Sequence, residues 1–139
     1  MNVRHFLATV ALIAWAGAAC AQGRVTAHVL DLYSGTAANG LKIELFVQES
    51  GSFKLLKSAV TNVDGRPPEG PLLTPQTIKP GRYQAVAHVG DYYKSIGAKL
   101  PSGYHTKLII EFEIYDAKAP HHLPFQITPW TQSTSVLPG

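Results

Sequence analysis

The sequence predicts an all-β sandwich of seven or eight short strands with one short helix. Apolar residues recur at every second position along most of the chain, and turn-forming clusters of Gly, Pro, Asn and Ser separate these runs. Successive side chains of a strand point to opposite faces, so this period indicates strands with one buried face. Helical periodicity is nearly absent. Short strands at this spacing are typical of a sandwich.

The first 21 residues have the pattern of a secretory signal peptide. Arg4 supplies a positive charge, and an apolar run from Phe6 to Ala19 follows it. This run is shorter than the roughly 20 residues that a membrane span requires. Small residues at Ala19 and Ala21 fit cleavage before Gln22.

Cleavage at this point would leave one domain, residues 22–139, in the periplasm of a bacterium. Two alternatives are an uncleaved membrane anchor and a lipoprotein. The lipoprotein would need a better residue than Gly17 three places before Cys20. About 118 residues are enough for one hydrophobic core and too few for two.

Composition and charge argue against a nucleic-acid partner and against thiol chemistry. The full chain has a net charge of +3, and its Lys and Arg residues are scattered singly between the expected strands. Nucleic-acid-binding proteins usually show a clustered basic face, so this partner is not expected. Cys20, the only cysteine, lies in the predicted signal peptide. The mature domain would therefore have neither a disulfide nor a thiol nucleophile.

Three strands and a turn are expected in the first half of the domain. The strands span residues 25–30, 41–47 and 53–60, and a cluster of turn-forming residues at 34–40 separates the first two. The segment Asn62–Arg66 is typical of a turn in which Gly65 adopts a positive φ. Arg66 should therefore lie where the chain leaves this turn.

Residues 67–81 are expected to form a loop, because their five prolines cannot donate to a strand ladder. One short strand is expected within the loop, near Leu72 and Leu73. Longer strands are predicted at 82–89, 107–114 and 122–128. Between the first two of these, Asp91 is expected to cap a short helix that Gly97 ends.

Three segments resemble the transthyretin-related hydroxyisourate hydrolase family, in the same order and at similar spacing. They are His28-Val29-Leu30-Asp31, Thr61-Asn62-Val63-Asp64-Gly65-Arg66, and Pro120-His121-His122-Leu123-Pro124 followed by Thr128-Pro129-Trp130. The resemblance covers essentially the whole predicted domain. It implies a transthyretin-like β-sandwich that assembles as a homotetramer. It also implies hydrolysis of 5-hydroxyisourate to 2-oxo-4-hydroxy-4-carboxy-5-ureidoimidazoline in urate degradation, without a cofactor.

The resemblance also implies the site residues. These are the catalytic residues His28, Arg66 and His122 and the substrate-binding residues Ser133 and Thr134. The family ends in Tyr-Arg-Gly-Ser, which lines the site where subunits meet, but here Ser-Val-Leu-Pro occupies positions 135–138. This departure leaves open a non-catalytic ligand-binding or interaction module with the same fold.

The three catalytic candidates suit hydrolysis of a ring amide. An imidazole titrates near pH 6.5, so two histidines can divide the acid and base roles. Arg66 can stabilise an oxyanion or hold a urate-like ring through its planar set of donors. No metal is expected, because the neighbouring His121 and His122 point to opposite faces of a strand. The chain also has no Gly-x-Ser-x-Gly or His-Glu-x-x-His motif.

Other conspicuous side chains are expected to serve the fold or the surface. The expected structural or surface residues are His88, His105, Tyr92, Tyr93 and Trp130, the last as a packing or subunit-contact residue.

Overall fold

A computed structural model describes residues 22–100, 103–104 and 106–138. The predicted signal peptide and His105 lie outside these residues. Within them, no helix is both long enough and apolar enough to cross a membrane.

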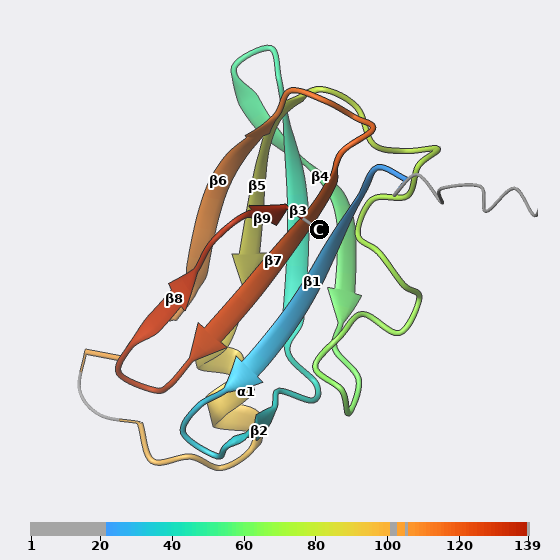
Figure 1. Cartoon of the computed structure of the whole chain (residues 1–139). Helices are drawn as coiled ribbons and strands as arrows, with labels where there is room; N and C mark the ends of the chain where they lie inside the picture. The colour runs from blue at the N-terminus through green and yellow to red at the C-terminus, as the bar shows by residue number, and fades with distance from the viewer. Residues whose placement is uncertain (1–21, 101–102, 105, 139) are drawn as a thin grey trace, which may run out of the picture.

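Two β-sheets pack face to face, as the sequence predicts (Figure 1). The first sheet has the order β2-β1-β7-β8, and β9 also pairs with β7; the second has the order β4-β3-β5-β6. The strands of the first sheet are β1 (Arg24–Asp31), β2 (Thr36–Ala37), β7 (Pro120–Ile127), β8 (Gln132–Thr134) and β9 (Leu137–Pro138). Those of the second are β3 (Lys42–Glu49), β4 (Ser52–Val60), β5 (Gly81–Ala87) and β6 (Leu108–Ile114).

Nine strands occur in the described part of the chain, where seven or eight are expected. The additional strands β2, β8 and β9 have only two or three residues, too few for a period of two to show. The strand expected near Leu72 and Leu73 is reduced to a single bridge between Leu73 and Val25. Prolines on both sides of this pair limit further pairing.

Strand β1 shows how the sequence divides the two faces of the first sheet. Val25, Ala27 and Val29 are buried between the sheets, whereas the side chains between them point outward. Strand β7 alternates in the same way and lies parallel to β1. In this register Thr26 lies opposite His122, and His28 lies opposite Pro124. Both histidines therefore project from the outer face of the sheet.

The helix α1 spans Val89–Ser95 and begins earlier than the sequence predicts. His88, not Asp91, occupies the N-cap position, and it makes no capping bond through its side chain. Strand β5 accordingly ends at Ala87 rather than at residue 89. The chain turns early because Val89 and Gly90 are buried and the Gly90 N–H donates to the Thr106 carbonyl at 2.9 Å. Gly97 follows the helix with a φ of 71°.

A buried polar cluster ties α1 to the end of β1. The hydroxyls of Tyr92 and Tyr93 both donate to the carboxylate of Asp31, which is fully buried. Burial, with a further contribution from Asp31, raises the pKa of Tyr92 to about 12. The two tyrosines therefore pack the helix, as expected, and they remain protonated at neutral pH.

Candidate active site

The turn that follows β4 is attached to β1, which fixes the position of Arg66. Asn62 Oδ1 accepts hydrogen bonds from the N–H groups of Asp64 and Arg66 at 3.0 and 3.1 Å. The Gly65 carbonyl accepts one from the Val29 N–H at 2.8 Å. Gly65 has a φ of 69°, and a Cβ there would collide with the Val29 carbonyl oxygen. The sequence therefore requires glycine beside Arg66 for two separate reasons.

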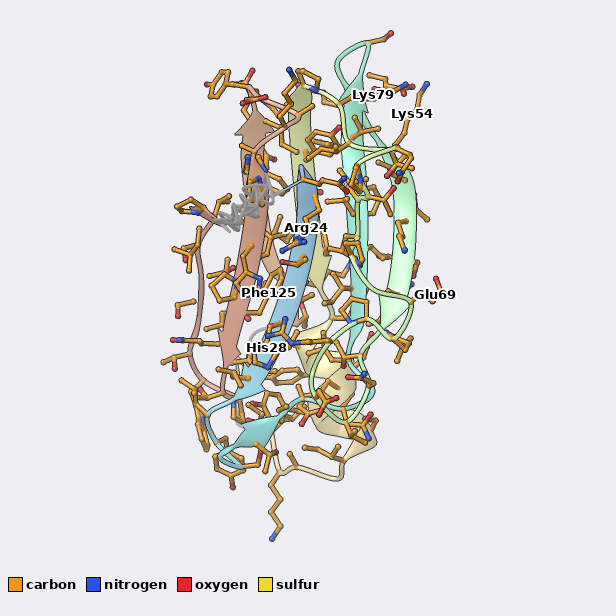
Figure 2. The ribbon with its side chains drawn as sticks, turned by 45° about the vertical axis from the view of Figure 1, so that its right-hand side comes forward. Arg24, His28, Lys54, Glu69, Lys79 and Phe125 are labelled. Atoms are coloured by element: carbon orange, nitrogen blue, oxygen red, sulfur yellow. The ribbon has the colours of Figure 1, made fainter. Side chains whose placement is uncertain are left out.

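His28 and His122 lie on neighbouring strands and share the outer face of the first sheet. Figure 2 shows His28 on β1. Both side chains are half-buried. The same Cβ at Gly65 would lie 3.3 Å from His28 Cδ2, which places the turn directly against the ring.

Electrostatic coupling links the two rings to Arg66. Burial lowers the pKa of His28, and the positive charge of Arg66 lowers it further, although Asp64 acts in the opposite direction. Burial also lowers the pKa of His122, with smaller contributions from Arg66 and His28. Both imidazoles are therefore neutral at neutral pH, the state in which a histidine can accept a proton.

Thr26 holds His122 through the ring nitrogen closer to the backbone. Its Oγ1 lies 2.8 Å from His122 Nδ1 and 3.4 Å from the His121 carbonyl oxygen. This contact occupies Nδ1 and leaves Nε2 for chemistry, either as an acceptor or as a donor, according to the tautomer. Sequence analysis missed Thr26. Its position two residues before His28, on the same strand face, is the signal that could have identified it.

The structure separates the two predicted substrate-binding residues. Ser133 of β8 pairs with Gln126, whose side chain is on the outer face, and its Oγ lies 3.5 Å from Gln126 Oε1. Thr134 pairs with Phe125, a core residue, and Thr134 Oγ1 is buried with no hydrogen-bond partner among the described residues. Ser133 thus shares the face of the histidines, whereas Thr134 is not brought to them.

The C-terminal segment that replaces the family's Tyr-Arg-Gly-Ser also lies beside the site. In β9, Leu137 pairs with His122, so the two share the outer face of the sheet. Leu137 thus occupies the position at which the family sequence has glycine, directly next to a candidate catalytic residue.

A hollow of about 340 Å³ adjoins these residues and is lined by Arg66 and Thr26. Another, of about 460 Å³, lies near Asp116–Ala119 and contains none of the three catalytic candidates. We place the site beside the smaller hollow, because its wall includes Arg66, which is coupled to both histidines, and Thr26, which contacts His122. In the part of the chain that the structure describes, no three His, Cys, Asp or Glu side chains form a group that could hold a metal ion.

The remaining conspicuous side chains lie apart from this site. His88 Nε2 is 2.7 Å from Glu44 Oε2 and belongs to the second half of the sandwich, between β5 and α1. Trp130 is half exposed and packs edge-on against Tyr33, with ring centroids 5.3 Å apart. Both positions agree with structural roles.

The fold and the candidate site define a β-sandwich protein that brings two histidines and an arginine together at one outer sheet face. Sequence comparison gives its family: residues 25–135 match the HIUase/Transthyretin family. A relative from Rhizobium meliloti, 5-hydroxyisourate hydrolase 2, is 41% identical over 81% of this chain and 93% of its own length. The 5-hydroxyisourate hydrolase of Pseudomonas aeruginosa is 38% identical over 81% of this chain and 89% of its own. The chain belongs to the HIUase/Transthyretin family.

Solved structures agree with this assignment. The Klebsiella pneumoniae 5-hydroxyisourate hydrolase superimposes with a TM-score of 0.66 and 30% identity, covering 82% of this chain and 98% of that one. An (S)-allantoin synthase gives a TM-score of 0.76 and 30% identity over 84% of this chain, which spans only 44% of the synthase. Sea bream transthyretin in complex with thyroxine, at 18% identity and a TM-score of 0.74 over 84% of this chain and 96% of its own, shares the fold.

Proposed function

We propose that the protein hydrolyses 5-hydroxyisourate to 2-oxo-4-hydroxy-4-carboxy-5-ureidoimidazoline, a step of urate and purine degradation. The observation that carries the proposal is the meeting of His28, His122 and Arg66 on one sheet face, where both imidazoles are held neutral. The similarity to hydrolases of this name supports the choice of substrate.

The site can open the ring by proton transfer alone. One neutral histidine accepts a proton from water while the water oxygen bonds to the ring carbonyl carbon. The guanidinium of Arg66 stabilises the negative charge that develops on the carbonyl oxygen. The C–N bond then breaks as that proton passes through the second histidine to the departing nitrogen, and the new carboxyl group ionises, which leaves a carboxylate and a ureido group. Thr26 contributes by holding His122 in one orientation.

We further propose that the chain assembles as a homotetramer in which the outer face of the first sheet is partly covered by another subunit. The exposed side chains of Leu137, on this face, and of Trp130, in the connection between β7 and β8, support burial against a symmetric copy. Light scattering at micromolar concentration should give a tetramer. A monomer throughout that range would contradict a site shared between subunits.

Export to the periplasm is proposed from the sequence of residues 1–21. Mass spectrometry of protein recovered from the periplasm of an expressing bacterium should give a chain that begins at Gln22. Recovery of the uncleaved chain from the membrane fraction would support the anchor instead.

The decisive experiment follows freshly generated 5-hydroxyisourate by ultraviolet absorbance with and without the purified protein. Faster decay that depends on protein concentration is the expected result.

The second candidate is a non-catalytic ligand-binding module, which the Ser-Val-Leu-Pro tail favours. Unaccelerated decay, both with the native tail and with Tyr-Arg-Gly-Ser restored at positions 135–138, would select that candidate.

A further inference from the structure

The hollow beside the catalytic candidates has a second guanidinium in its wall. Arg24 and Arg66 both line it, and its volume is about 340 Å³. The other lining residues are Gln22, Thr26, Ala27, Pro67, Gly70, Pro71 and Pro75. Among these residues there is no carboxylate, so the wall has two positive charges and no negative one.

Strand geometry places Arg24 in line with the site. Arg24, Thr26 and His28 alternate with buried residues and share the outer face of β1. Figure 2 shows Arg24 and His28 along this strand. A strand rises about 3.3 Å per residue, so the Cα atoms of Arg24 and Thr26 lie roughly 7 Å apart. Thr26 in turn contacts His122, and Arg66 forms part of the wall, so the hollow borders the catalytic candidates.

Neither guanidinium is engaged by the protein itself. Within residues 22–100, 103–104 and 106–138, Arg24 and Arg66 form no ion pair, and their side chains make no hydrogen bond. Three prolines form much of the remaining wall, and a proline has no N–H to donate. The donors available to an occupant are therefore mainly the two planar guanidinium groups. Such groups bind carboxylates and similar planar oxygen anions with paired hydrogen bonds.

We propose that Arg24 determines specificity by forming, with Arg66, a subsite for a planar organic anion with carboxylate or ring-carbonyl oxygens. This inference rests on the proposed function, because hydrolysis of the ring amide creates a carboxylate next to Arg66. Arg24 holds the anionic edge of the ring before the reaction and the new carboxylate after it. It lies beyond the reacting atoms and contributes to binding rather than to bond cleavage.

The test compares Arg24→Gln, which removes the charge, with Arg24→Lys, which keeps the charge but loses the planar set of donors. Arg82→Gln is the matched control, because Arg82 is an exposed arginine of β5 in the other sheet. Two readouts are needed. One is the affinity for urate, a planar purine anion, measured by calorimetry. The other is the separate measurement of KM and kcat for decay of 5-hydroxyisourate.

Arg24→Gln should weaken urate binding and raise KM by about tenfold each, as expected for loss of one charge-assisted contact, while kcat changes far less. Arg24→Lys should change urate affinity and KM less than Arg24→Gln does, and Arg82→Gln should change neither. Unchanged urate affinity in Arg24→Gln, or an equal loss in Arg82→Gln, would overturn the subsite. A native protein that binds urate through Arg24 but does not accelerate decay would contradict the proposed function and leave the subsite standing.

Discussion

Histidines occur on both halves of the sandwich, and their charged neighbours differ. On the first sheet, His28 and His122 face the guanidinium of Arg66. At the other sheet, His88 contacts the carboxylate of Glu44, which also binds Lys42 at 2.6 Å. A nearby cation favours the neutral imidazole of His28 and His122, whereas the Glu44 carboxylate occupies a ring nitrogen of His88. Together with burial, the charged partner therefore distinguishes the two histidines available for proton transfer from the one that joins elements of the fold.

The two regions also respond differently to acid. The hydrogen bonds from Lys42 and His88 lower the pKa of Glu44, so the stability from this cluster is present above the usual carboxyl range and is lost as pH falls through the lowered value. The pKa values of His28 and His122 are also lowered. For a histidine this means that the unfolded chain takes up protons first, so their contribution opposes folding once pH falls below about 6.5. The catalytic face should therefore weaken at a higher pH than the Glu44 cluster.

The largest expected effect comes from the catalytic histidines. Replacing His28 or His122 with Asn keeps the approximate size of the side chain but removes proton transfer. We expect a loss of about 100- to 10,000-fold in the rate of 5-hydroxyisourate decay, with little change in unfolding temperature. His88→Asn is the control, and it should leave the rate intact. An equal loss of rate in His88→Asn would show that the contrast between the two faces has no bearing on function.

Restoring the family tail should have the next largest effect. Leu137 pairs with His122, so an apolar side chain now stands where the family sequence has glycine. Changing positions 135–138 to Tyr-Arg-Gly-Ser should raise the rate by about tenfold, equivalent to roughly 1.4 kcal/mol of barrier. The gain should vanish when His122→Asn is added. A tail that raises the rate equally in that double variant would be acting away from the site.

Much of the fold followed from local sequence because its causes are local. Alternating apolar residues placed β1 and β7 correctly, and the Asn62–Arg66 turn followed from the conformational freedom of Gly65. The start of α1 did not follow, because burial of Gly90 and its bond to Thr106 depend on a distant segment. Strands β8 and β9 are too short to have a pattern of their own.

The site was predictable only in part. Resemblance supplied His28, Arg66 and His122, but their meeting depends on the parallel pairing of β1 with β7, nearly one hundred positions apart. Thr26 and Arg24 were missed because an outward threonine or arginine on a strand is ordinary until its neighbours are known. Ser133 and Thr134 were both predicted to bind substrate. They are neighbours on a strand, however, so their side chains point to opposite faces.

Thr26 offers a smaller and more selective test. Thr26→Val preserves the shape but removes the hydroxyl that lies 2.8 Å from His122 Nδ1. The ring should lose its fixed orientation, and kcat should fall by about tenfold, the cost of roughly one hydrogen bond. Thr26→Ser should restore most of the rate. If Thr26→Val kept the native kcat, as Thr26→Ser is expected to do, the contact would be structural and other groups would orient His122.

The smallest expected effect concerns the charge of Arg66 itself. In the native protein, the pKa values of His28 and His122 should both lie below 6.5, as measured by following the ring protons by NMR against pH. Arg66→Gln removes the positive charge, so both pKa values should rise toward 6.5, whereas Arg66→Lys and the distant Arg82→Gln should leave them low. Added salt should shift the native values in the same direction as Arg66→Gln, because Arg66 is exposed and its field is screened. The acidic limb of kcat/KM should follow the same order, with the native enzyme retaining activity to a lower pH than Arg66→Gln. Burial is the larger cause of both shifts, so part of the lowering should survive in every variant.

If Arg66→Gln left both pKa values unchanged, burial alone would keep these imidazoles neutral, and the role of Arg66 would be confined to binding the substrate and its oxyanion.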